Sequence, residues 1–169
     1  ELKNINVSSI QPHPQNDKIY DTKGKVFQDG IESLKQSISK LGLLEPLVLN
    51  KKNVLLSGHR RFTAIKELGI KKCEVRVVDV ENELYVLIHS NRQRVKSETE
   101  ISREIKIIGE ELLKDRKLGR PSKDGKSKPK GTIRKQISET LGISEGKIQY
   151  IKRKEVELQE IKMHNEKLF

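Results

Sequence analysis

Several residue types are scarce in this chain of 169 residues. It has one cysteine, no tryptophan and 4% aromatic residues, and hydrophobic residues make up 33% of it. A single cysteine can form neither an internal disulfide nor a zinc site of its own, which excludes a disulfide-stapled secreted scaffold. Cys73 lies in an apolar run, and we expect it to be a buried, inert side chain.

Long hydrophobic runs are missing as well. No stretch approaches the roughly 18 consecutive apolar residues of a spanning helix, so an integral membrane protein is excluded. The chain opens on Glu1-Leu2-Lys3-Asn4, with neither an initiator Met nor an apolar signal region. We expect a trimmed, cytoplasmic protein with no membrane partner. The thin apolar supply favours two compact pieces joined by a polar segment.

Patterns of catalytic or metal-ligating side chains are also absent from the sequence. The acidic residues are scattered and form no paired-carboxylate motif, and no arrangement resembles a nucleophile triad. The histidines show no metal-ligand spacing. They are His13, His59, His89 and His164. The residues by themselves therefore indicate no class of enzyme.

Cationic residues, by contrast, are abundant and unevenly distributed. The formal net charge is +11. Residues 114–154 carry 14 Lys and Arg against 4 Asp and Glu, whereas residues 1–113 carry 19 against 16. A basic block beside a folded unit indicates a polyanionic partner, nucleic acid before membrane. The alternative is a solvated Lys-rich surface that aids solubility.

Alternating short strands and helices predict a mixed α/β fold for about the first 90 residues. An extended segment opens the chain, residues 15–28 form a loop, and Asp29 caps a helix that ends at Gly42, with Glu32 completing a capping box. The remaining elements follow in order: a hairpin of 47–49 and 54–56, a helix over 62–68, a strand over 75–80 and a helix over 84–88.

Helical periodicity dominates the rest of the chain. A long helix is expected over about 99–116, followed by a flexible basic linker over 117–131 that is rich in Gly, Pro, Ser and Lys. We therefore predict two domains, residues 1–95 and 96–169. The second is all-α and includes a helix-turn-helix over 133–154.

The strongest local signal in the second domain is the spacing of that helix-turn-helix. Gly142 can supply the left-handed turn residue, and Ser144 can cap the second helix, which would enter a DNA major groove. Exposed Lys and Arg would pair with phosphates, and Gln149 could read a base edge. The candidate DNA contacts are Arg134, Ser144, Lys147, Gln149, Tyr150, Lys152 and Arg153. The alternative is a helical hairpin that binds nothing.

A second signal is Ser57-Gly58-His59-Arg60-Arg61, which lies between a predicted strand and a predicted helix. A glycine-containing turn at a helix start directs backbone N–H groups and the helix dipole to one spot, where a phosphate can bind. Two arginines add bidentate positive charge there. The alternative is a pair of solvated arginines.

In order and spacing, these residues resemble ParB-type partition proteins of the ParB/sulfiredoxin superfamily. Four boxes carry the resemblance ahead of the helix-turn-helix: VSSIQPHP (7–14), GLLEPLV (42–48), GHRR (58–61) and SNRQR (90–94). The likeness covers about residues 1–154. It implies an α+β protein in which a small mixed α/β domain of the ParB/sulfiredoxin type precedes an all-α DNA-binding domain.

The resemblance also implies a function: a CTP-dependent DNA clamp of plasmid, chromosome or phage partition. Two protomers of a homodimer bind a specific double-stranded DNA site, CTP with Mg²⁺ closes the gate, and slow CTP hydrolysis reopens it. It further implies a ParA-type ATPase partner, association with the nucleoid or a plasmid, and Asn91 as a Mg²⁺ ligand. The implied nucleotide-binding residues are Gly42, Leu43, Leu44, Glu45, Pro46, Ser57, Gly58, His59, Arg60, Arg61, Asn91, Gln93 and Arg94.

Four positions depart from the family pattern. Ser90 and His59 each replace a Glu, Glu45 replaces a Gln, and Lys18 stands where an Arg is usual. Because Ser90 removes a hard anionic ligand from a Mg²⁺–triphosphate site, we expect altered nucleotide binding and a CTPase activity that is weak or absent.

Two other classes of function stay open. One is a transcriptional or accessory DNA-binding protein that keeps the fold without using a nucleotide. The other is an enzyme on the same fold, a nuclease or a small-molecule kinase; sulfiredoxin chemistry is excluded because His59 occupies the position of its cysteine. The acidic stretch from Glu155 suits a further helix, which packs on the helix-turn-helix or leads to a dimerisation domain.

Overall fold

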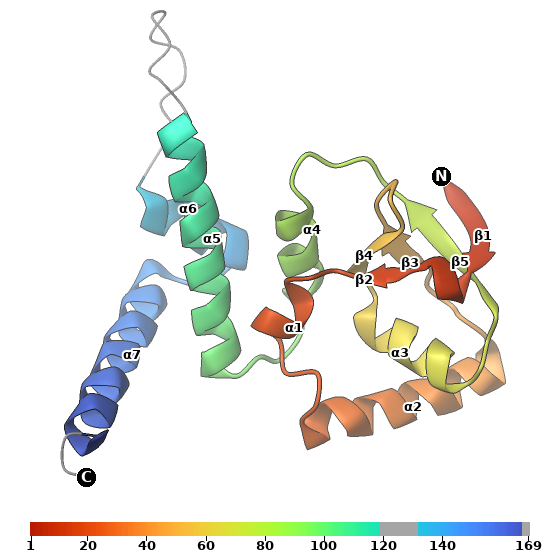
Figure 1. The fold of residues 1–169 in the computed structure, drawn as a ribbon, viewed down its shortest axis with the longest axis horizontal. Helices are drawn as coiled ribbons and strands as arrows, with labels where there is room; N and C mark the ends of the chain where they lie inside the picture. Colours follow the sequence, from red (N-terminus) through yellow and green to blue (C-terminus); the bar gives the residue numbers. More distant parts are fainter. Residues whose placement is uncertain (119–131, 167–169) are drawn as a thin grey trace, which may run out of the picture. The chain divides into compact units, whose positions relative to one another are not determined.

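A computed structural model describes residues 1–118 and 132–166 of the chain (Figure 1). It divides into two compact units, Glu1–Gln93 and Arg94–Phe169, so the observed boundary falls two residues before the predicted one. Most of the predicted basic linker, residues 119–131, lies outside the described residues. No helix in the described part of the chain has the length and apolar character needed to cross a bilayer.

The first unit is built on a five-stranded mixed sheet of order β1-β5-β3-β4-β2. The β1–β5 and β3–β4 pairs are antiparallel, whereas β3–β5 and β2–β4 are parallel. The strands are β1 (Leu2–Asn6), β2 (Gln11–Pro12), β3 (Leu47–Leu49), β4 (Val54–Ser57) and β5 (Lys72–Val77). The predicted hairpin is therefore confirmed, and its turn is held by Asn50, whose side-chain oxygen accepts from the backbone N–H groups of Lys52 and Val54 at 2.8 Å each.

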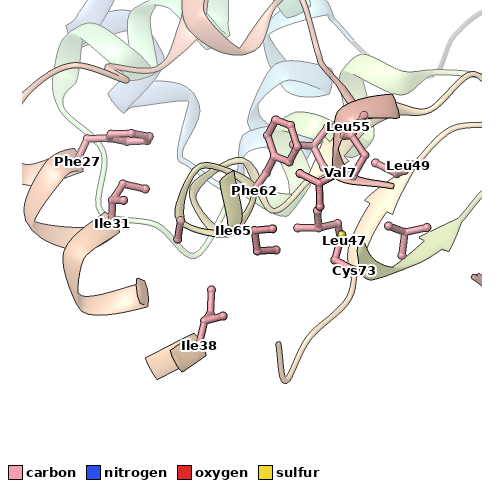
Figure 2. Packing of buried hydrophobic residues seen from close by; sticks show 13 residues of the cluster. Val7, Phe27, Ile31, Ile38, Leu47, Leu49, Leu55, Phe62, Ile65 and Cys73 are labelled. Atoms are coloured by element: carbon pink, nitrogen blue, oxygen red, sulfur yellow. The ribbon is translucent and has the colours of Figure 1, made fainter. Parts of the chain in front are cut away.

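Helices and one short 3₁₀ turn complete the first unit. They are the 3₁₀ turn Val7–Ser9, α1 (Asn16–Ile19), α2 (Lys25–Leu41), α3 (His59–Glu67) and α4 (Glu83–Ser90). Helices α2 and α3 pack against each other, and their apolar side chains meet those of the strands (Figure 2). Burial of this cluster is the main apolar stabilisation of the unit. Its members include Phe27, Ile31, Leu47, Leu55, Phe62 and Ile65.

The prediction for the start of α2 was wrong. The helix begins at Lys25 rather than after Asp29, and a short helix, α1, occupies part of the predicted loop. Burial of Phe27 extends the apolar stripe of α2 one turn toward the N-terminus, which outweighs the local capping signal at Asp29. The chain enters the helix through Asp21, whose carboxylate accepts from the N–H groups of Lys23 and Gly24 at 2.9 Å.

The strand after α3 is shifted relative to its prediction. It starts at Lys72 and ends at Val77, because pairing with β1 brings residues from Lys72 onward into the sheet. Cys73 is consequently a buried strand residue, as predicted. Burial also raises the pKa of its thiol, which keeps the thiol protonated and unreactive.

The second unit consists of three described helices: α5 (Glu98–Leu118), α6 (Ile133–Leu141) and α7 (Glu145–Glu166). Ser97 and Glu100 form a reciprocal capping box at the start of α5. The buried residues at the centre are Ile101, Ile105, Ile108, Ile137, Leu141, Ile148 and Ile151. The expected separate helix from Glu155 is wrong, since no Gly or Pro interrupts the chain after Gly146 and α7 continues through it.

Candidate functional site

The turn from β4 into α3 has the geometry predicted for a phosphate site. Gly58 is the N-cap of α3 and adopts a left-handed conformation with φ 97°. A side chain there would be strained, because the backbone is left-handed and a Cβ would lie 2.7 Å from Cδ2 of the buried Leu47, which would have to shift. No side chain caps the first turn of α3. The first backbone N–H groups of this helix have no partners within the helix, and such groups attract an anion.

Arg61 connects this turn to the segment 42–46. Its Nη1 donates to the carbonyl oxygens of Glu45 at 2.8 Å and Pro46 at 3.4 Å, and it lies 2.9 Å from Oε2 of Glu45. The structure thus brings together two segments that the sequence placed at one site. Within 42–46, Gly42 has a φ of 74° and Leu44 is exposed.

Arg60 takes a different direction and lies against α2. Its guanidinium occupies the space in which a Cβ of Gly30 would stand. Its Nε is buried without a hydrogen-bond partner and is one of two such side-chain atoms in the described part of the chain. A buried N–H of a permanent cation without an acceptor is costly, so this residue fits an anionic ligand.

A cavity of about 410 Å³ lies beside α3, toward α1 and the start of α2. It is lined by Pro12, Asn16, Asp17, Thr22, Phe27, Gln28, His59, Phe62, Thr63, Lys66 and Glu67. Of these, sequence reasoning had selected only His59. The helical spacing of His59, Thr63 and Lys66 could have identified one wall, whereas the opposite wall comes from the part of α1 and α2 that was predicted to be a loop.

His59 is the first residue of α3 and contacts the segment 7–14 near the start of the chain. Its Nε2 accepts from the backbone N–H of His13 at 3.4 Å, and Nδ1 of His13 accepts from the N–H of Gln15 at 3.2 Å. Burial, together with the nearby His13, lowers the pKa of His59 to about 4, although Asp17 acts in the opposite direction. His59 is therefore neutral at pH 7 and adds no charge to the site.

The depressed pKa of His59 predicts a pH-dependent stability. Between about pH 6.5 and 4 the unfolded chain binds more protons than the folded one, so the free energy of unfolding falls as the pH falls through this window. The expected loss between pH 7 and 5 is about 2 kcal/mol, measured by urea unfolding. In His59→Gln the part of the loss due to His59 disappears and only that of His13, whose pKa burial also lowers, remains; His89→Gln, at an exposed position, keeps the whole loss. Equal pH dependence in the two variants would contradict the assignment.

Residues 90–94, at and after the end of α4, are partly engaged in contacts within the protein. The amide nitrogen of Asn91 donates to the carbonyl of Leu87 at 2.9 Å, and Oγ of Ser90 donates to that of Val86 at 2.7 Å. Gln93 is exposed, and Arg94 belongs to the second unit, where its Nη2 lies 2.8 Å from Oε1 of Glu100.

A metal ion would find few protein ligands among the described residues. They hold no group of three or more His, Cys, Asp or Glu that could bind one. The side-chain oxygen of Asn91 is the donor that the resemblance assigns. It fits Mg²⁺ in a site where the phosphates and water supply the other ligands.

In the second unit, the turn between α6 and α7 has the predicted form. Gly142 is left-handed with φ 68°, and Oγ of Ser144 accepts from the N–H of Lys147 at 3.2 Å as the cap of α7. The hydroxyl of Ser138 donates to the carbonyl of Ile143 at 2.6 Å, which ties α6 to the turn. These bonds fix the angle at which α7 leaves α6.

The predicted DNA contacts are all exposed. They are Arg134 on α6 and Ser144, Lys147, Gln149, Tyr150, Lys152 and Arg153 at the start of α7. The neighbouring Lys154 is engaged instead, because its Nζ lies 2.6 Å from Glu98 and 5.6 Å from the centre of the Tyr150 ring. Exposed Lys and Arg side chains of this kind can pair with phosphates without giving up buried contacts.

Comparisons with known proteins agree with this architecture. The model of the ParB N-terminal domain family matches residues 1–91. The "Probable chromosome-partitioning protein ParB" of Campylobacter jejuni is 35% identical over 84 residues, which is 47% of this chain and 28% of that protein. Its counterpart from Helicobacter pylori is 30% identical over 82 residues, or 47% of this chain and 27% of that protein. The matched stretch covers less than a third of the length of these relatives.

Solved structures resemble the fold. A pNOB8-like ParB N-domain has a TM-score of 0.63 at 13% identity, covering 86% of this chain and 65% of that one. A C-terminally truncated ParB from Caulobacter crescentus, complexed to the centromeric parS site, has a TM-score of 0.55 at 18% identity, covering 88% and 69%. The predicted α+β class is thereby confirmed, and because the family model matches more than half of its residues, this chain belongs to the ParB N-terminal domain family.

Proposed function

We propose that this protein binds double-stranded DNA through α6 and α7 and acts in DNA partition as a nucleotide-switched clamp. The observation that carries the proposal is the set of exposed basic side chains Lys147, Lys152 and Arg153 on α7, which follows a capped left-handed turn, in a chain whose first unit is a ParB N-terminal domain. The relatives named as chromosome-partitioning proteins support the same role. The working form is a homodimer with a ParA-type ATPase partner, associated with a nucleoid or plasmid.

The nucleotide proposed for the first unit is CTP with Mg²⁺, which would supply the energy of closing two protomers around DNA. The N–H groups at the start of α3 and the guanidinium of Arg60 would hold its phosphates. The segment 42–46 would contact the base, and the oxygen of Asn91 would contact the metal. The buried, unpartnered Nε of Arg60 supports an anionic ligand here.

A second candidate function keeps the DNA binding and omits the nucleotide. Two observations favour it. The hydroxyl of Ser90 donates a hydrogen bond to the carbonyl of Val86, and the described part of the chain has no cluster of acidic residues that could hold the metal of a nucleotide. Such a protein would be a static transcriptional or accessory factor on the ParB fold.

Isothermal titration of the protein with CTP, ATP and GTP in Mg²⁺, with and without DNA, separates the two candidates. We expect micromolar, CTP-selective binding that responds to DNA. Hydrolysis is expected to be slow or absent, because Ser90 supplies no carboxylate to the metal. A protein that holds DNA but binds no nucleotide would contradict the clamp and favour the static factor.

A further inference from the structure

We propose that the two adjacent arginines of the α3 turn have different tasks. Arg60 is the anion ligand, whereas Arg61 is a positioning residue that holds the segment 42–46 against the start of α3 and thereby sets the selectivity for the base. The inference rests on the proposed nucleotide function and divides the work within that site.

The contacts of Arg61 are those of a structural brace. One nitrogen, Nη1, is shared among two backbone carbonyls and one carboxylate of the 45–46 segment. The other side of the guanidinium faces Gly58, with Nη2 3.3 Å and Nε 3.4 Å from the position of a Cβ there. The side chain is 20% exposed. Arg61 therefore spans the gap between two turns that the base and the phosphates would each touch.

Within this brace, the carboxylate of Glu45 is the weaker partner. It is 79% exposed, and exposed ion pairs contribute little. The backbone carbonyls of Glu45 and Pro46 accept charge-assisted hydrogen bonds from Arg61, and these bonds hold the segment 42–46 in position relative to Arg61. Glu45→Gln should consequently leave the brace in place.

Arg60 has the opposite character. Its guanidinium lies over Gly30, a position on α2 where any side chain would displace it. Its Nε is buried and has no acceptor. An anion that accepts a hydrogen bond from this nitrogen would remove the cost of leaving it unbonded. Because Gly30 has no side chain, it leaves room for the guanidinium of Arg60 in this position.

The test uses inorganic triphosphate, which carries the charge of the ligand without a base, alongside CTP and ATP. Titrations compare the wild type with Arg60→Ala and Arg61→Ala. Arg60→Ala is expected to weaken triphosphate and CTP alike, by tenfold or more. Arg61→Ala is expected to bind triphosphate within about threefold of the wild type but to lose its preference for CTP over ATP.

Gly30→Ala provides a variant that leaves both arginines in the sequence. Alanine is a better helix former than glycine, so α2 should remain folded while Arg60 is pushed from its seat, and the variant should behave like Arg60→Ala. Ser37→Ala, at an exposed position of the same helix, is the matched control and should bind all three ligands like the wild type.

The outcomes distinguish a failure of the division of tasks from a failure of the proposed nucleotide binding. If the wild type binds CTP but both arginine variants lose triphosphate equally, or Arg61→Ala keeps its CTP preference, the division of tasks is wrong and the nucleotide function stands. If the wild type binds neither CTP nor triphosphate, the nucleotide function itself is overturned, and the inference with it.

Discussion

A protein in which Lys147 and Arg153 are both alanine is expected to bind double-stranded DNA about a hundredfold more weakly than the wild type at moderate salt. Both side chains are exposed at the start of α7. If each pairs with one phosphate, their loss lowers the number of released counterions and flattens the dependence of log affinity on log salt by about 2. Fluorescence anisotropy with a labelled duplex at four KCl concentrations measures both quantities.

The matched control for this experiment is Lys162→Ala. Lys162 is an exposed lysine of the same helix, several turns beyond the capped turn. It should retain wild-type affinity and salt slope. If the double variant behaves like this control, α7 does not face DNA and the proposed groove contact is wrong.

Replacing Glu104 by alanine is expected to lower the free energy of unfolding by about 3–5 kcal/mol. Both of its carboxylate oxygens accept from Nζ of Lys96, at 2.7 and 3.0 Å. The two side chains are 1% and 8% exposed, so the variant leaves a lysine charge buried without this carboxylate. Urea unfolding followed by circular dichroism measures the loss.

Two variants distinguish this buried pair from an ordinary surface charge. Glu110→Ala removes an exposed carboxylate from the same helix and should change the stability by less than about 0.5 kcal/mol. Lys96→Met combined with Glu104→Leu removes both charges and should recover most of the loss. A Glu104→Ala protein as stable as Glu110→Ala would show that the pair contributes nothing.

Elements whose signals are local were predictable. The left-handed Gly142, the cap at Ser144 and the hairpin around Asn50 each depend on residues within four positions of one another. The start of α2 was not, because the local capping box at Asp29 competes with burial of Phe27 against residues far along the chain. Here the free energy gained by burying the large aromatic side chain of Phe27 exceeds that of the local capping interaction, and it sets where α2 begins.

For the candidate site, the sequence by itself determined which residues are available: a bare glycine turn, two arginines at a helix start and a basic second helix. Only the tertiary structure decided their tasks. Arg61 finds its acceptors 15 and 16 residues away in the chain, and Arg60 finds its seat on another helix, at Gly30. Adjacent residues on a helix point about 100° apart, and the partner that each one meets depends on packing between elements, which no local pattern encodes.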